Sequence, residues 1–403
     1  MKRSMLCVLL ILSWPARSQE IQWHGFLDLR VIDAPSTRSW LDGGTGKLRY
    51  GDGATSARLG GAALIGTAQL MPSLLAYVDV QFHNDDESSL ELIEAYLRYR
   101  PVSLTPWRWS LKVGAFFPPI SLENDAIGWT SPWTLTPSAI NSWVGEELRS
   151  AGTEFHIERR GEHSTLEASA AAFLGNDPAG EILAARGWSL SDLTYGYNGQ
   201  VREPDVYAIE DGVTPPLRYR PFVELDHRAG WYADLTWRSQ RYGRFSILRY
   251  DNRADSTQSS TYDGHTTFAW RTKFWSLGAE QQFGPVELIA QAMTGTTVFT
   301  PSPFYTGETE FHAGYVLAGW TRGAWRPALR LDLFSLRQMP PSEIPLSEHG
   351  NALTAALTWR PRPWLRLTGE VIRMDSSRRQ RVLDGIDPAR IDTQLQLGAR
   401  LLF

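Results

Sequence analysis

The stretch that decides the fold is the last one, Asp392-Thr393-Gln394-Leu395-Gln396-Leu397-Gly398-Ala399-Arg400-Leu401-Leu402-Phe403. Its apolar residues occupy alternate positions and share one face, namely Leu395, Leu397, Ala399, Leu401 and Phe403. A strand with one face in hydrocarbon and the other in water has this period of two, and about ten tilted residues cross a bilayer. A surface strand of a soluble sheet alternates in the same way. The rest of the chain must therefore decide between the two.

The first residues have the pattern of a secretory signal. Lys2 and Arg3 precede an apolar run over residues 5–14, and Ala16-Arg17-Ser18 is a small-x-small cleavage site. We therefore predict a signal peptide over residues 1–18 and a single transmembrane barrel domain over residues 19–403. The only cysteine, Cys7, lies in the signal, so the mature chain has no thiol for a disulfide or a thiolate metal site.

Composition points to a membrane barrel. After the signal no run of about eighteen apolar residues is present, which excludes a spanning helix. Aromatic residues make up 12% of the chain, with 17 Trp, 14 Tyr and 16 Phe, although the mean hydropathy is slightly polar at −0.28. This combination suits a barrel with a wet lumen and aromatic girdles at both interfaces. Most of the positive charge is arginine, whose paired donors suit oxyanions.

Long and short connections alternate along the chain. Short turns such as Pro72-Ser73, Gly284-Pro285 and Gly323-Ala324 alternate with long segments such as 35–56, 118–147 and 175–229. Bacterial barrels have short periplasmic turns and long extracellular loops. The girdle agrees, because aromatic residues gather at the short-turn ends, namely Trp107, Trp237, Trp325, Trp359, Trp364 and Phe403.

The predicted fold is thus all-β: a transmembrane antiparallel barrel of about 16 strands, with 18 as the alternative, in the outer membrane of a Gram-negative bacterium. One predicted strand, 268–283, changes phase near Phe274-Trp275, where we expect a bulge. The surroundings we expect are outer-membrane lipid and lipopolysaccharide, with the barrel-assembly machinery reading the strand that ends in Phe403.

A barrel of this width leaves an aqueous channel by default. The predicted pore-lining residues are the inward ones of the strands: Glu94, Tyr96, Arg98, Arg100, Arg108, Lys112, Glu154, His156, Arg238, Arg330, Arg366 and Arg400. Arg98, Arg100, Arg108 and Lys112 fall on adjacent inward faces, a pattern that favours anions. The alternative is that these charges merely pair with neighbouring acids.

The segment 118–147 is the candidate constriction loop. An exposed loop with three tryptophans would leave apolar area in water, whereas a loop folded into the lumen would bury them and narrow the pore. The candidate residues are Glu123, Asp125, Trp129, Trp133, Trp143, Glu146 and Glu147. Alternatively, the loop packs against other loops or a partner subunit. The longest connection, 175–229, is predicted to be an extracellular loop that is functional or mobile.

Two runs resemble a known family. They are Leu92-Ile93-Glu94-Ala95-Tyr96-Leu97-Arg98-Tyr99-Arg100 and Leu111-Lys112-Val113-Gly114-Ala115-Phe116-Phe117-Pro118-Pro119-Ile120-Ser121-Leu122-Glu123. The second is similar to the Gly-x-Phe-x-Pro-Pro hairpin of the phosphate-selective porin O and P family. This resemblance implies a sixteen-stranded homotrimeric porin with an inward-folded third loop. Family members that select phosphate use lysine rings, and this chain, with four lysines, departs from that pattern.

The function predicted is therefore passive diffusion of small hydrophilic solutes, with a preference for anions. One alternative is a hydrolase built on His156 with Glu154, Glu158 and Ser150, and another is a surface-binding or assembly role for the segment 175–229. The acidic run Asp85-Asp86-Glu87 could bind calcium, or be simply solvated. We expect no catalytic residue, cofactor, metal or nucleic-acid partner, since Asp42-Gly43-Gly44-Thr45-Gly46-Lys47 lacks the strand-loop-helix context of a phosphate loop.

Overall fold

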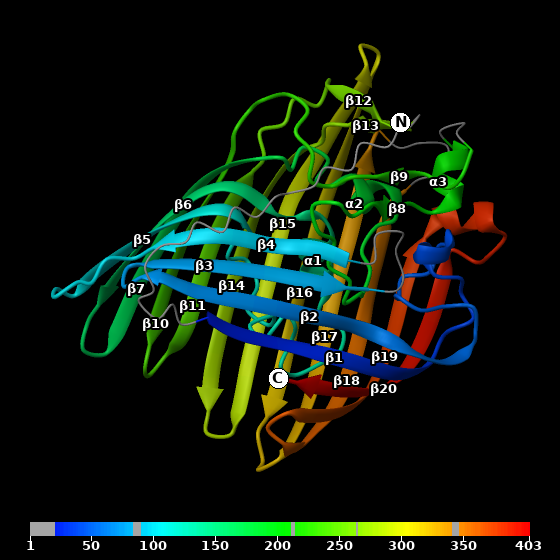
Figure 1. The fold of residues 1–403 in the computed structure, drawn as a ribbon. Coiled ribbons are helices and arrows are strands. Elements are labelled where there is room, and N and C mark those ends of the chain that lie inside the picture. The colour runs from blue at the N-terminus through cyan, green and yellow to red at the C-terminus, as the bar shows by residue number, and fades with distance from the viewer. Residues whose placement is uncertain (1–20, 84–89, 211–213, 263–264, 341–345) are drawn as a thin grey trace, which may run out of the picture.

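The chain forms a closed barrel of sixteen antiparallel strands, in the order β1-β2-β3-β4-β5-β6-β7-β10-β11-β14-β15-β16-β17-β18-β19-β20 (Figure 1). The computed structural model describes residues 21–83, 90–210, 214–262, 265–340 and 346–403. The first seven strands are β1 Ile21–Asp33, β2 Thr55–Met71, β3 Leu74–Phe82, β4 Leu90–Tyr99, β5 Trp107–Phe116, β6 Ser150–Arg160 and β7 Ser164–Leu174. The other nine are β10 Gly230–Ser239, β11 Gly243–Asp251, β14 Arg271–Phe283, β15 Val286–Ser302, β16 Tyr305–Trp320, β17 Trp325–Met339, β18 Glu348–Arg362, β19 Leu365–Arg378 and β20 Ala389–Leu402. The predicted all-β barrel of 16 strands is confirmed.

The two ends of the chain close the barrel. β1 pairs with β20 from Phe26 opposite Leu402 to Asp33 opposite Leu395. Beyond the last ladder pair, the Gly25 amide donates to the Phe403 carbonyl at 3.0 Å and the Phe403 amide donates to the Gly25 carbonyl at 3.2 Å. A side chain at residue 25 would overlap the Phe403 ring. Glycine therefore allows the terminal aromatic residue to seal the seam.

Inward and outward faces alternate as the terminal stretch predicts. In β20 the leucines Leu395, Leu397 and Leu401 are exposed on the outer surface, whereas Gln394 and Gln396 are buried inside. An exposed apolar band around a closed sheet is unfavourable in water but favourable in contact with the hydrocarbon of a bilayer. No helix in the described part of the chain is long and apolar enough to cross a membrane. The protein is a bacterial outer-membrane barrel, and its strands do the crossing.

The aromatic girdle lies at the short-turn ends of the strands. Gly284 and Gly323 have φ of +59° in the turns β14–β15 and β16–β17, a conformation that glycine adopts without strain. Girdle tryptophans lie exposed on the outer surface beside these turns, and Trp325 stacks on Trp359 with ring centroids 5.6 Å apart. These rings mark one interface of the bilayer.

Two sequence predictions need comment. The bulge expected near Phe274-Trp275 is wrong, because β14 pairs with β11 and β15 in unbroken register. Phe274 points inward without a bulge, since the lumen beside it is filled with aromatic side chains. The predicted signal peptide and the acidic run Asp85-Asp86-Glu87 lie outside the described residues.

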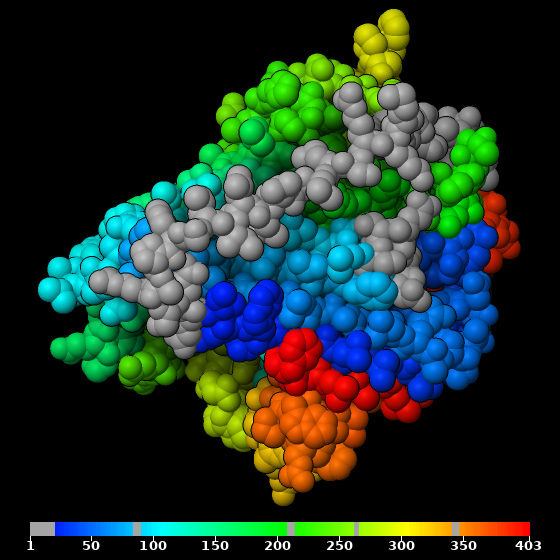
Figure 2. Space-filling view, viewed as in Figure 1, coloured from blue at the N-terminus to red at the C-terminus, as the bar shows by residue number. Residues whose placement is uncertain are grey.

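Long connections fill much of the barrel interior. They contain α1 Ala139–Glu147, α2 Glu181–Ala185, α3 Asp205–Glu210, the 3-10 helices η1 Trp40–Asp42 and η2 Arg379–Asp384, and two small sheets, β8 Val201–Arg202 with β9 Arg218–Tyr219 and β12 Ser259–Tyr262 with β13 His265–Phe268. Figure 1 shows α1 within the outline of the barrel and α2, α3, β8 and β9 at its long-loop end. In the space-filling view green residues of the long connections lie along this end of the barrel (Figure 2). Trp143 and Trp188 of these connections belong to the buried core. The wide barrel is therefore not an open tube.

Candidate pore and its constriction

The segment 118–147 leaves the wall where β5 ends. Gly114 has φ of +136°, and any side chain there would overlap the Ala95 carbonyl. Pro118 and Pro119 have no amide hydrogen, so they cannot extend the ladder. The Phe117 amide instead donates to Glu94 Oε1 of β4 at 3.0 Å. The glycine and the two prolines thus end the strand and direct the chain into the lumen.

Polar side chains on the opposite wall bind this segment. Arg330 of β17 donates to the carbonyls of Thr136 at 2.7 Å and Pro137 at 2.9 Å. Glu370 of β19 accepts from the Leu135 amide at 2.6 Å. Asp332 of β17 accepts from the Ala139 amide at 3.1 Å and pairs with Arg330 at 2.8 Å. These side chains and the backbone groups they satisfy are buried, so the segment crosses the lumen in a fixed position.

Helix α1 then runs through the middle of the barrel. Ser138 begins it by accepting a hydrogen bond from the Asn141 amide. Every residue of the helix is buried. Trp143 packs edge-on against Trp188, Phe274 and Phe311, with centroids 5.2–6.0 Å apart. The lumen at this level is an apolar core shared between the wall and the connections.

The last two residues of α1 bind the 175–229 connection. Glu146 forms a buried ion pair with Arg186 at 2.5 Å. Glu147 accepts from the amides of Gly180 and Ile182, both at 3.0 Å, and from Trp143 Nε1 and the Tyr219 hydroxyl. Burial raises the pKa of Glu147 to about 7 in spite of these donors. The two connections therefore form one packed unit.

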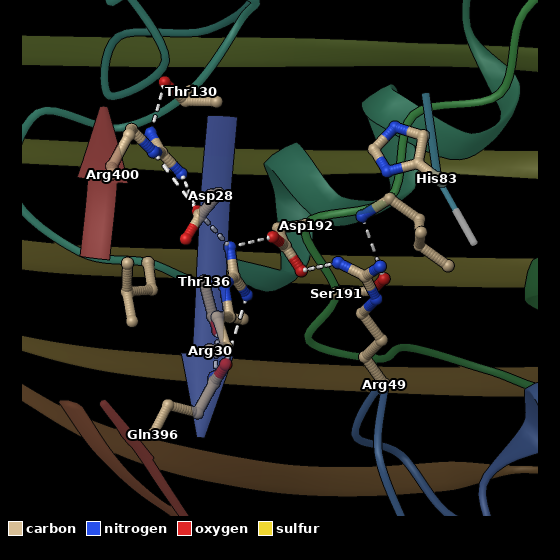
Figure 3. Close-up of polar contacts among 12 residues, drawn as sticks. Asp28, Arg30, Arg49, His83, Thr130, Thr136, Ser191, Asp192, Gln396 and Arg400 are labelled. Atoms are coloured by element: carbon tan, nitrogen blue, oxygen red, sulfur yellow. Dashed lines mark hydrogen bonds and ion pairs between the residues drawn. The ribbon is translucent and has the colours of Figure 1, made fainter. Parts of the chain in front are cut away.

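Asp192 joins this unit to the barrel wall (Figure 3). Its carboxylate pairs with Arg30 of β1 at 2.5 Å and with Arg49 of the 35–54 connection at 2.8 Å. Burial acts to raise the pKa of Asp192, but the two guanidinium groups outweigh it and lower that pKa well below its usual range. Lys47 in the same connection pairs with Glu348 of β18 at 2.8 Å. Three connections, 35–54, 118–147 and 175–229, are thus bound to the wall by buried charges.

A second wall network lies beside Asp192. Asp28 of β1 pairs with Arg400 of β20 at 2.7 Å and with Arg30 at 2.9 Å (Figure 3). Arg400 also donates to the Thr130 hydroxyl at 3.0 Å. Gln396 accepts from Arg30 at 3.1 Å and donates to Thr136 at 3.0 Å. The seam β1–β20 therefore contacts both the 118–147 and the 175–229 segments.

The basic wall predicted on β4 and β5 is largely paired with carboxylates of β6. Glu158 is 3.1 Å from Arg100 and 4.0 Å from Arg108. Lys112 is 2.7 Å from Glu154. Arg238, predicted on β10, pairs with Glu167 of β7 at 2.8 Å. On this side of the barrel the positive charge is mostly neutralised, which is the alternative stated from sequence.

The remaining predicted residues are dispersed. Tyr96 stacks on Tyr77 with centroids 4.7 Å apart, and Trp129 stacks on Phe117 at 4.2 Å. Glu123 is buried 3.6 Å from Arg330, whereas Asp125 is exposed. Trp133 is buried under the Arg326 guanidinium, 5.1 Å from the ring centroid.

Sequence reasoning missed several inward arginines, among them Arg30 of β1, Arg326 of β17 and Arg360 of β18. A signal is present for the last two, because each follows a girdle tryptophan, as in Trp325-Arg326 and Trp359-Arg360. Successive residues of a strand face opposite sides. An outward tryptophan at the short-turn end therefore places the following arginine inside the lumen.

The hydrolase constellation is not brought together. His156 of β6 lies opposite Ser110 and Ser169 in the ladder. Ser150 is buried, while Glu154 and Glu158 pair with Lys112 and Arg100. No hydrogen bond links His156 to Ser150, Glu154 or Glu158, all of which the structure describes. A nucleophile, a base and an orienting acid would have to be within such reach.

A carboxylate group that the sequence did not reveal lies in the 175–229 connection. Ligand oxygens of Asp177, Glu224 and Asp226 lie within 4.8 Å of one another. Burial, followed by the neighbouring charges of Glu224 and Asp226, raises the pKa of Asp177 to about 7. Backbone amides already occupy these oxygens: the Gly175 amide donates to Glu224 at 2.8 Å and the Leu225 amide to Asp177 at 2.5 Å. The group organises the two ends of the connection.

The barrel and its inward connections can be compared with known proteins. The outer-membrane channel DcaP of Acinetobacter baumannii superposes with a TM-score of 0.56 at 12% identity, over 97% of this chain and 99% of that one. An anion-selective porin from Comamonas acidovorans gives 0.55 at 12% identity, over 96% and 100%. This chain has the porin fold. The trimer form of OmpT, an outer membrane protein of Vibrio cholerae, gives 0.51 at 10% identity, over 96% and 99%.

Sequence comparison adds nothing to this likeness. No protein-family model matches the chain, and no curated protein matches it. The structural matches cover 96–97% of this chain and 99–100% of the matched chains, so they concern nearly the complete architecture.

Proposed function

We propose that the protein is an outer-membrane porin through which small hydrophilic solutes diffuse passively. The observation that carries this proposal is the attachment of the 118–147 segment across a polar-walled barrel, through Arg330, Asp332 and Glu370. A wide barrel has space that its own side chains cannot fill. A loop fixed across that space sets the size of what passes.

The proposed constriction includes more than one connection. Glu147 of the 118–147 segment accepts from the Ile182 amide of α2, and Ser142 accepts from the Ser191 amide at 2.9 Å. Asp192, the next residue, pairs with Arg49 of the 35–54 connection, so the passage width depends on all three inward connections. In the described structure their apolar side chains form one core with the wall. A solute therefore passes either when the connections move apart or along a narrow path beside the polar wall. Small solutes and low conductance are the expected consequence.

An anion preference is part of the proposal. The predicted lining residues Arg98, Arg100, Arg108 and Lys112 contribute less than their number suggests, because carboxylates pair with three of them. The positive excess lies instead on β17–β20, where Arg326, Arg360 and Arg366 have no ion pair with a described residue. A lumen with arginines on one wall favours anions.

Assembly and placement complete the proposal. The likeness of residues 92–100 and 111–123 to the phosphate-selective porins, and the trimer form of the Vibrio cholerae structure, support a homotrimer. Lipid and lipopolysaccharide surround the exposed leucines, and the barrel-assembly machinery reads the seam strand that ends in Phe403. A hydrolase is not favoured, since His156 lies apart from the groups that would make it a base.

Liposome swelling tests this function. Proteoliposomes containing the mature protein should swell in small sugars more slowly as solute size increases, and faster in a small carboxylate than in a neutral solute of matched size. An ester or phospholipid substrate should remain intact. Swelling that never exceeds that of empty liposomes would reject the proposal.

A further inference from the structure

Four inward arginines form a cluster near the short turns of β17–β20. Arg366 of β19 lies directly opposite Arg400 of β20. Trp359 pairs with Leu367, and the ladder shifts register between Trp359 and Arg362, so Arg360 of β18 lies next to the paired residues, close enough to Arg366 for the two charges to repel. Arg326 of β17 is opposite Thr358, two residues from Arg360. We call Arg326, Arg360 and Arg366 the arginine row.

Within the part of the chain that the structure describes, the row makes no ion pair of the kind that neutralises other lumen arginines, although the charges of Asp125 and Glu287 act on Arg326 from farther away. Arg400 at its edge pairs with Asp28 at 2.7 Å. Among the described residues, no carboxylate oxygen lies within ion-pair distance of Arg326, Arg360 or Arg366. Like charges directly opposite one another in a ladder are destabilising. Repulsion between these guanidinium groups therefore destabilises the barrel here, and a bound anion would reduce that repulsion.

The donors of the row are also largely unused. Arg360 donates only a long bond of 3.4 Å to the Pro132 carbonyl, and its buried Nε has no acceptor. Arg366 makes no hydrogen bond to any residue that the structure describes. Arg326 lies over the Trp133 ring, 5.1 Å from its centroid, and makes no hydrogen bond to a residue that the structure describes. Beside them the hydroxyls of Thr358 and Thr368, 2.9 Å apart, share one hydrogen bond and leave a second proton to donate.

The partial exposure of the three arginine side chains is consistent with a site that a solute can reach. All three arginines are partly exposed. Arg330, four residues beyond Arg326 in β17, is fully buried by its contacts with the 118–147 segment. The short-turn end of a bacterial barrel faces the periplasm. The row therefore lines the inner mouth of the lumen, below the constriction.

We propose that the arginine row is a binding site for a multivalent oxyanion, a solute bearing phosphate or several carboxylates. Planar guanidinium groups bind such oxygens through paired donors. Three adjacent guanidinium groups match two or more negative charges better than a single chloride. This proposal rests on the proposed porin function only for the route of the solute, since binding itself needs no transport.

The test measures binding and current separately. Mature protein folded in detergent is titrated calorimetrically with inorganic phosphate and with succinate, at constant ionic strength in chloride. Arg360→Gln with Arg366→Gln should weaken binding of the preferred probe at least tenfold. The matched control, Arg100→Gln with Arg238→Gln, removes two lumen arginines that carboxylates neutralise, and should change affinity less than twofold. The arm with the larger effect, phosphate or succinate, identifies the ligand chemistry.

A second variant guards against loss of folding. Arg366→Lys keeps the charge but loses the paired donors, and should weaken binding by a smaller factor than the double variant. In planar bilayers the same probe, added on the short-turn side, should block chloride current in native protein and not in the double variant. Equal binding in all variants, or no binding to folded native protein, would overturn the site. Binding without any chloride current would leave the site standing and reject the porin function.

Discussion

Asp192 forms a largely buried ion pair with Arg30 of β1 at 2.5 Å, across 162 residues of sequence. It also pairs with Arg49, so one carboxylate joins the 175–229 connection, the 35–54 connection and the wall. A charge with two buried partners cannot be removed without leaving both guanidinium groups uncompensated. This carboxylate is therefore a central attachment of the inward connections.

Asp192→Asn should release these connections. Breaking a buried pair by removing one partner costs about 3–5 kcal/mol, part of which is regained when the freed segment lets water reach Arg30 and Arg49. We expect faster proteolysis within 175–229 and larger chloride conductance. The control is Asp205→Asn, since Asp205 in the same connection pairs with the exposed Arg38 and the partly exposed Arg202, whose charges water can solvate. Equal proteolysis rates in the two variants would contradict the assignment.

Trp143→Ala should open the lumen at the level of α1. The ring packs against Trp188, Phe274 and Phe311, and removing a buried tryptophan costs about 3–5 kcal/mol. We expect a lower unfolding midpoint in detergent and a larger single-channel conductance. The control is Trp275→Ala. Trp275 follows Phe274 in β14, and its ring is exposed on the lipid-facing side of the barrel. Its conductance should match that of native protein.

Glu147 should make attachment of the connections depend on pH. Burial raises its pKa from an ordinary 4.5 to about 7. The packed state therefore binds the proton more tightly than the released state, and its stability falls as pH rises between about 4.5 and 7. Chloride conductance should increase across this interval. Glu147→Gln should flatten the increase, leaving a smaller slope from Asp177, whose pKa is also raised to about 7. An unchanged slope in Glu147→Gln would show that another group is responsible.

Glu158→Gln should increase anion preference. This carboxylate neutralises Arg100, Arg108 and Arg160, which lie 3.1, 4.0 and 2.8 Å from it. Its removal leaves positive charge on that wall. Reversal potentials in asymmetric potassium chloride should shift toward the chloride equilibrium potential. Glu162→Gln, in the exposed turn after β6, is the control and should cause no shift.

The alternation of apolar residues predicts the barrel wall well, because lipid contacts every strand in the same way. The terminal stretch 392–403 is assigned correctly since its outward leucines and inward glutamines depend only on local period. The bulge predicted near Phe274-Trp275 is wrong because the Phe274 ring packs inside the barrel against Trp143 and Phe311, which come from distant segments. The local period contains no information on what fills the lumen.

The same limit applies to the site. Arg100 and Lys112 can be placed on the inner face from sequence, but their pairing with Glu158 and Glu154 depends on the register between β4, β5 and β6. Arg366 could be predicted, whereas its closeness to Arg360 requires the pairing of β18 with β19. The ion pairs of Asp192 could not be predicted from sequence, because no local feature distinguishes this residue from other acidic residues in a polar connection.

Single-channel recording tests the central claim most directly. Purified mature protein, shown by circular dichroism to be folded as β-sheet, is added to planar bilayers in potassium chloride. The account predicts discrete conductance steps that are small for native protein and larger for Trp143→Ala and Asp192→Asn. Folded, inserted protein that gives no steps, in native form and in both variants, would contradict it.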